Sequence, residues 1–86
     1  MAQFLGIHEG AIFVDDSKAK GGADDSWEAY KAACAAYSCR PLHVHYNMDA
    51  SRAFCLTEAN SAEEVKAAHR DANLNIKEVI EVETAE

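Results

Sequence analysis

The chain has 86 residues, the length of one domain, and we expect a single domain over residues 1–86. Its 15 acidic residues outnumber the 8 basic ones, so the net charge is −7 with histidine neutral. This charge argues against a nucleic acid or an anionic membrane surface as a partner and leaves cations open. A hydrophobic fraction of 49% is typical of a folded domain, and no apolar stretch approaches the roughly 20 residues of a transmembrane helix.

The N-terminal segment and the cysteines bear on the compartment. The first ten residues contain no basic side chain and include the acidic Glu9, which is not typical of a secretory signal. Three cysteines, Cys34, Cys39 and Cys55, are an odd number and form no Cys-x-x-Cys pair. Free thiols fit a reducing environment better than a disulfide framework does. We therefore expect a cytoplasmic protein.

The chain begins with a predicted strand. Residues 3–8 alternate, so that Phe4 lies on one face and Leu5 and Ile7 lie on the other. The apolar residues 11–14 either continue this strand or pack as a short extension.

A loop and a helix are predicted next. Residues 15–25 are polar and contain a Gly-Gly pair, which favours a loop. Asp25 or Ser26 can cap the helix that follows, and Pro41 marks the start of the next element. Four residues recur at helical spacing and define its buried face: Trp27, Tyr30, Cys34 and Tyr37.

A hairpin is predicted from two apolar segments over residues 42–46 and 52–58, joined by a turn over residues 47–51. In the first of them the apolar side chains should face the helices, which places His43 and His45 on the opposite face. The length of the turn leaves two registers open. One sets Cys55 opposite His43 on the bare face of the sheet. The other sets it opposite Val44 in the core beneath the helices.

The second half of the chain repeats the pattern of helix and strand. Ser61 and Glu64 form a capping box at the start of a helix that runs to about Ala72. Residues 77–83 predict the last strand, so the order is β-α-β-β-α-β. This order predicts a ferredoxin-like α+β fold, with two helices on one face of a four-stranded antiparallel sheet in the spatial order 4-1-3-2. The other face is left bare, which favours a homodimer.

Two histidines on one predicted strand are candidate metal ligands. His43 and His45 are two residues apart, so their side chains should lie on one side of the strand, about 7 Å apart at the backbone. A His-x-His pair often supplies two nitrogen ligands to a transition metal. The alternative is a pair of solvated or dimer-face histidines.

Four further residues complete the predicted set of six ligands. They are His8, Glu9, Cys55 and His69. His8 and Glu9 at the end of the first strand are either a mixed nitrogen and oxygen pair or a strand-end histidine beside a solvated carboxylate. Cys55 joins the site in one hairpin register. His69 lies one residue past the inward-facing Ala68, at the edge of the buried face of the helix. Three roles are open to it: a metal ligand, an oriented base, or a boundary residue that water satisfies. No GxSxG, HExxH or phosphate-binding glycine motif is present, so a binding protein is favoured over an enzyme.

Three segments carry a resemblance to a known family: Phe4-Leu5-x-x-His8, residues 52–59 with 61–63, and residues 68–72 followed by Glu81-Val82. Together they resemble the small bacterial nickel-binding-protein-like family, classed as a domain of unknown function. The resemblance implies a ferredoxin-like homodimer that binds nickel through His, Cys and carboxylate side chains. His8, Cys55 and His69 fall where the family often has His, Cys and His. Asn73 and the His8-Glu9 pair stand where the family tends to have further histidines.

The leading hypothesis is a homodimer that binds nickel or another divalent transition metal, through ligands drawn from His8, Glu9, His43, His45, Cys55 and His69. Such a site should lose its metal as the pH falls through the histidine range, because the ligands must be deprotonated. One alternative is a dimeric α+β barrel enzyme or small-molecule binder with a pocket between the sheet and the helices. The other is a purely structural dimer.

Overall fold

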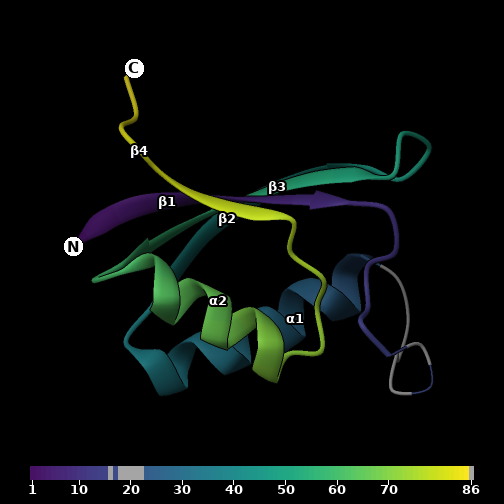
Figure 1. Cartoon of the computed structure of the whole chain (residues 1–86), viewed down its shortest axis with the longest axis horizontal. Coiled ribbons are helices and arrows are strands. Elements are labelled where there is room, and N and C mark those ends of the chain that lie inside the picture. The colour runs from purple at the N-terminus through teal and green to yellow at the C-terminus, as the bar shows by residue number, and fades with distance from the viewer. Residues whose placement is uncertain (16, 18–22, 86) are drawn as a thin grey trace.

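The computed structural model describes residues 1–15, 17 and 23–85, and these residues form a four-stranded sheet covered on one face by helices (Figure 1). The strands are β1 (Ala2–Glu9), β2 (Arg40–Asn47), β3 (Arg52–Ala59) and β4 (Glu78–Val82). The helices are α1 (Ala23–Cys34), a 3₁₀ turn η2 (Ala35–Tyr37) and α2 (Ala62–Asp71). The sheet order is β2-β3-β1-β4, with all neighbours antiparallel. The predicted ferredoxin-like α+β fold is confirmed.

The largest departures from the predicted elements lie between β1 and α1. Helix α1 begins at Ala23, so Asp25 and Ser26 lie inside its first turn and do not cap it. The middle of the predicted loop, including its Gly-Gly pair, falls outside the described residues. Residues 11–14 do not extend the strand, because Gly10 turns the chain at a φ of 83°. Phe13 makes only an isolated bridge to Leu74.

The start of α2 follows the predicted capping box with one difference. The Ser61 hydroxyl accepts a hydrogen bond from the Glu64 backbone N–H at 3.4 Å. The Glu64 carboxylate accepts from the backbone N–H of Asn60, one residue before the cap, at 3.0 Å. Both bonds satisfy N–H groups near the start of the helix. None of the described helices is long and apolar enough to cross a bilayer.

The β2–β3 register decides which face carries Cys55. Val44 pairs with Cys55, so Cys55 points towards the helices and lies in the core. His43 pairs with Leu56 and His45 pairs with Phe54, which places both histidines on the outer face of the sheet. This outcome matches the second of the two registers that the sequence left open. A bulge between Pro41 and His43 adjusts the pairing at the start of β2.

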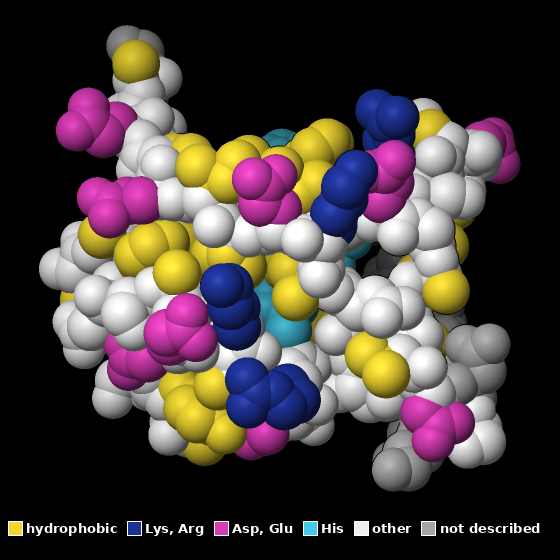
Figure 2. Space-filling view, viewed as in Figure 1, with side chains coloured by type: hydrophobic (Ala, Val, Ile, Leu, Met, Phe, Trp, Pro, Cys, Tyr) yellow, Lys and Arg dark blue, Asp and Glu magenta, His cyan; other side chains and the backbone are white. Residues whose placement is uncertain are grey.

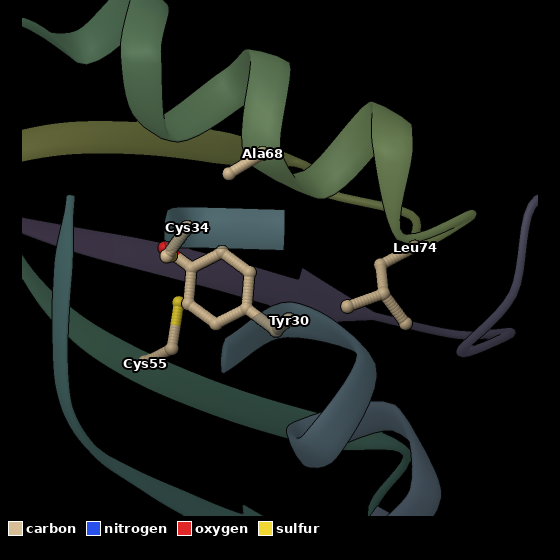
Figure 3. Packing of buried hydrophobic residues seen from close by; sticks show 5 residues of the cluster. All are labelled: Tyr30, Cys34, Cys55, Ala68 and Leu74. Carbon is tan, nitrogen blue, oxygen red and sulfur yellow. The ribbon is translucent and has the colours of Figure 1, made fainter. Parts of the chain in front are cut away.

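The core lies between the sheet and the helices and contains Tyr30, Cys34, Cys55, Ala68 and Leu74 (Figure 3). Tyr30 on α1 is 1% exposed, and Cys55 on β3 points towards its ring. The Tyr30 hydroxyl is 2.5 Å from the hydroxyl of the buried Thr57, so each satisfies the other. This bond joins α1 to β3 and holds the aromatic ring beside Cys55 and His69 (Figure 3).

Candidate metal centre

Three side chains that are far apart in the sequence converge under the helices. His8 comes from the end of β1, Cys55 from the middle of β3, and His69 from the last turn of α2. Their nearest donor atoms all lie within 4.8 Å of one another. The Cys55 Sγ is 3.4 Å from the Nε2 of His8 and 3.5 Å from the Nε2 of His69. The two imidazole rings lie with their centroids 5.0 Å apart.

Backbone carbonyls determine which ring nitrogen of each imidazole carries the proton. The Nδ1 of His8 is 2.7 Å from the Asn75 carbonyl oxygen, and the Nδ1 of His69 is 2.8 Å from the Val65 carbonyl oxygen. Because a carbonyl oxygen can only accept, each Nδ1 carries the proton and donates it. In the neutral ring the lone pair is then on Nε2, the atom that faces Cys55. Both imidazoles therefore direct an Nε2 lone pair at the Cys55 sulfur, whose single S–H can donate to only one of them at a time.

Burial keeps the three groups neutral. It lowers the pKa of His69 to about 4, and the hydrogen bond to Val65 only partly offsets this. It also lowers the pKa of His8. Burial raises the pKa of the Cys55 thiol to about 12. At neutral pH the imidazoles are ready to coordinate a cation, whereas the thiol must first lose its proton.

Close packing behind Cys55 depends on Gly6, its partner on β1. A Cβ atom at Gly6 would lie 2.5 Å from the Cys55 Sγ and 2.8 Å from the Cδ1 of Ile76. The absence of a side chain therefore lets the thiol and the His69 ring meet above the strand. Sequence reasoning gave Gly6 no role, although a glycine inside a strand often marks such a close approach. It also missed the carbonyls of Val65 and Asn75, which no residue-type pattern reveals.

The donor set fits a divalent transition metal. Two imidazole nitrogens and one thiolate suit Ni²⁺, Cu²⁺ and Zn²⁺. Bonds of the length that Zn²⁺ forms separate tetrahedral donor atoms by about 3.5 Å, close to the two observed sulfur–nitrogen distances. The Nδ1 bonds to carbonyl oxygens are the outer contacts that metal-binding histidines usually make. If a metal binds here, His8, Cys55 and His69 would hold it, and it would supply a Lewis-acidic centre.

The other three residues of the predicted ligand set lie elsewhere. Glu9 is exposed, with its carboxylate 2.6 Å from the Lys77 Nζ and 4.0 Å from Arg52. His43 and His45 lie on the outer face, with ring centroids 4.9 Å apart, and the sheet separates them from Cys55. The structure thus brings together His8, Cys55 and His69 and leaves Glu9, His43 and His45 outside this cluster.

The chain also matches the model of a known protein family. A family model described as "Nickel responsive protein SCO4226-like" matches residues 7–82, which include all three residues of the cluster. The chain belongs to the SCO4226-like family. The family resemblance predicted from the sequence segments is therefore confirmed.

One solved structure of this family gives a close match in fold. It is the crystal structure of SCO4226 from Streptomyces coelicolor A3(2), which superposes with a TM-score of 0.81. The match covers 99% of this chain and 100% of the other at 21% sequence identity. At this identity the likeness to SCO4226 shows the shared fold. No curated protein matches the sequence of this SCO4226-like chain.

Proposed function

We propose that this protein binds a divalent transition metal through His8, Cys55 and His69, with nickel as the first candidate. The observation that carries the proposal is the pair of Nδ1-to-carbonyl bonds, which directs both Nε2 lone pairs at Cys55. A buried Cys that serves only to fill the core does not need two imidazoles held in this way. Nickel is the first candidate, ahead of zinc and copper, because the family description names nickel responsiveness.

The role that fits such a site is binding, sensing or sequestering the ion. The net charge of −7 favours the approach of a cation. Three cysteines without a disulfide partner support a reducing, cytoplasmic location. A thiolate ligand also stays available only where Cys55 is kept reduced.

Metal binding is tested by dialysing purified protein against Ni²⁺ and then measuring bound metal by elemental analysis. We expect one ion per chain in the wild type and a large loss in Cys55→Ser, which replaces the sulfur donor. Cys39→Ser is the matched control, because Cys39 lies outside the cluster. The His8→Gln variant should lose binding as well, whereas the double variant His43→Gln/His45→Gln should keep it. Wild-type protein that takes up no nickel, and no zinc or copper when dialysed against those ions instead, would contradict the proposal.

We also propose that the protein is a homodimer formed through the outer face of the sheet. Cross-strand pairs arrange apolar side chains in rows on this face, where Leu5 lies between Leu56 and Ile80, and Ile7 lies beside Phe54. Phe54 is 38% exposed and Ile80 is 40% exposed. In Figure 2 this face runs along the top of the view, where hydrophobic side chains gather above the sheet. A second copy would remove this surface from water.

The oligomeric state can be measured by sedimentation or by light scattering after size exclusion. We expect a dimer for the wild type and a monomer for Phe54→Asp, which puts a charge in the middle of the apolar rows. Met48→Asp is the control, since Met48 is 51% exposed in the β2–β3 turn. A wild type that remains monomeric at high concentration would rule out the dimer and leave the metal proposal intact.

A further inference from the structure

A cavity opens beside the His8–Cys55–His69 cluster, between the sheet and α1. Its volume is about 100 Å³. All three donor residues line it, and Figure 2 shows a hollow between the sheet and the helical layer with histidine surface at its edge. Tyr46 and Met48 also line it and are 52% and 51% exposed, so the cavity reaches solvent near the β2–β3 turn.

The cavity lies on the open side of the cluster. Behind Cys55, the β1 backbone at Gly6 and the side chain of Ile76 leave no room even for a methyl group. Against His69, the Tyr30 ring packs with its centroid 4.2 Å away. The Nδ1 atoms of both histidines are engaged by carbonyls. Among the described residues, the cavity is the open approach that reaches all three donor residues.

The side chains that line the cavity indicate which class of ligand it could bind. The apolar side chains of Ile12, Trp27, Tyr30, Val44 and Leu74 form most of them. No carboxylate of the described residues lines the cavity, and among them Arg52 is the only charged lining side chain, because both histidines are neutral. The volume is of the same order as the ~150 Å³ apolar cavity that holds benzene in an engineered protein. A neutral, flat ring of about six atoms therefore fits both the size and the chemistry.

We propose that this cavity binds a small neutral aromatic molecule with one nitrogen donor, which it directs at the His8–Cys55–His69 cluster. This inference rests on the proposed metal site, because the donor atom needs an ion to bind. A site with three protein ligands usually keeps one coordination position for a ligand from outside. An aromatic nitrogen matches the borderline softness of the His and Cys donors. The tilted rings of Trp27 and Tyr30, whose centroids are 6.0 Å apart, supply aromatic contacts for the ring of the ligand.

Pyridine and benzene make a matched pair of probes, since they share size and shape and differ in one nitrogen atom. Trp27 is the only tryptophan of the chain and lines the cavity, so its fluorescence reports occupancy directly. In the nickel-loaded protein we expect saturable fluorescence changes, with pyridine binding roughly tenfold or more tighter than benzene. In the metal-free protein the two probes should bind equally. A change in the nickel absorption spectrum should accompany pyridine binding alone.

Filling the cavity provides the second half of the test. Ala53→Leu adds a side chain at a lining position and should weaken pyridine binding roughly tenfold without changing nickel uptake. Ala53→Val should have a smaller effect of the same sign, and it guards against poor folding of the larger variant. Ala32→Leu on the exposed side of α1 is the control and should behave like the wild type.

The outcomes separate the two proposals. If the protein takes up no metal, the metal proposal fails, the donor part of this inference fails with it, and the metal-free titration decides whether the cavity binds aromatic rings. If nickel binds but pyridine shows no preference over benzene, only the present inference is overturned. Equal pyridine binding by the wild type and the two Ala53 variants would also overturn it.

Discussion

The Nε2 of His8 lies 3.4 Å from the Sγ of Cys55, a residue 47 positions further along the chain. The antiparallel pairing of β1 with β3 produces this contact, because it sets Gly6 opposite Cys55 and His8 opposite Ala53. His8 and Cys55 therefore share the helix-facing side of the sheet as diagonal neighbours. Helix α2 then places His69 above the same point.

Replacing Gly6 by Ala should disturb the cluster directly. The new Cβ would lie 2.5 Å from the Cys55 Sγ, so the thiol or the strand must shift. We expect the free energy of unfolding to fall by about 1–3 kcal/mol and the metal affinity to fall with it. Denaturant unfolding and nickel titration measure the two effects.

Gly10→Ala is the matched control for Gly6→Ala. A Cβ at Gly10 meets nothing within 4 Å, but its φ of 83° strains any other residue. This variant should lose about 1 kcal/mol of stability and keep its metal affinity. Equal metal affinities in Gly6→Ala and wild-type protein would show that the close packing behind Cys55 does not matter for the site.

Metal affinity should rise with pH well above the ordinary histidine range. The pKa of His69 is lowered to about 4 and that of Cys55 is raised to about 12, so at neutral pH only the thiol gives up a proton on binding. We expect the apparent affinity for nickel to rise about tenfold per pH unit between about pH 7 and pH 9. Calorimetry in buffers of different ionisation enthalpy should detect release of about one proton per ion.

Cys55→Ser provides the control for this pH dependence. Its residual metal binding should be weaker and nearly independent of pH over the same window, because the serine hydroxyl keeps its proton. A wild-type affinity that stays constant over this window would mean that the thiol does not bind the metal as a thiolate.

The free energy of unfolding of the metal-free protein should depend on pH on the acid side, between about pH 4 and pH 6.5. His69 has an ordinary pKa near 6.5 in the unfolded chain and about 4 in the folded protein. Between these values the unfolded chain takes up a proton that the folded protein refuses. The stabilisation is therefore complete above about pH 6.5 and is lost as the pH falls towards 4. Up to about 3 kcal/mol should be lost, and urea unfolding at a series of pH values measures it.

The burial of His69 is the cause of that loss, so the variant His69→Gln should show a much shallower pH dependence in this window. His43→Gln should retain the wild-type dependence, since His43 is exposed on the outer face. A wild type equally stable at both ends of the window would contradict the buried neutral imidazole.

The bond between Tyr30 and Thr57 should contribute to stability as a pair. The hydroxyls are 2.5 Å apart and both residues are buried, so Tyr30→Phe leaves the Thr57 hydroxyl without this partner. We expect each of Tyr30→Phe and Thr57→Val to cost about 1–3 kcal/mol, and the double variant to cost less than their sum. Thermal unfolding of the four proteins completes the cycle, and strict additivity would show that the two hydroxyls are not coupled.

The fold could be predicted from the sequence because its signals are local. The alternation in residues 3–8 predicts a strand, and the capping box at Ser61 predicts the start of a helix. Both patterns depend only on neighbouring residues and on the repeat of the backbone. The start of α1 at Ala23 was missed because two polar residues with good capping chemistry, Asp25 and Ser26, stand inside the helix. The β2–β3 register stayed open because it depends on the turn, and Val44 opposite Cys55 is settled only in the folded sheet.

The sequence by itself determined the fold class, the family and the pool of His and Cys residues, since these depend on residue types and short-range periodicity. Only the tertiary structure decided which of them meet. Strand pairing puts His8 and Cys55 on one face and His43 and His45 on the other, and α2 adds His69 to the first group. The lone pairs are aimed by the carbonyls of Val65 and Asn75, groups that every residue carries. Their importance comes from position in space, which residue identity does not encode.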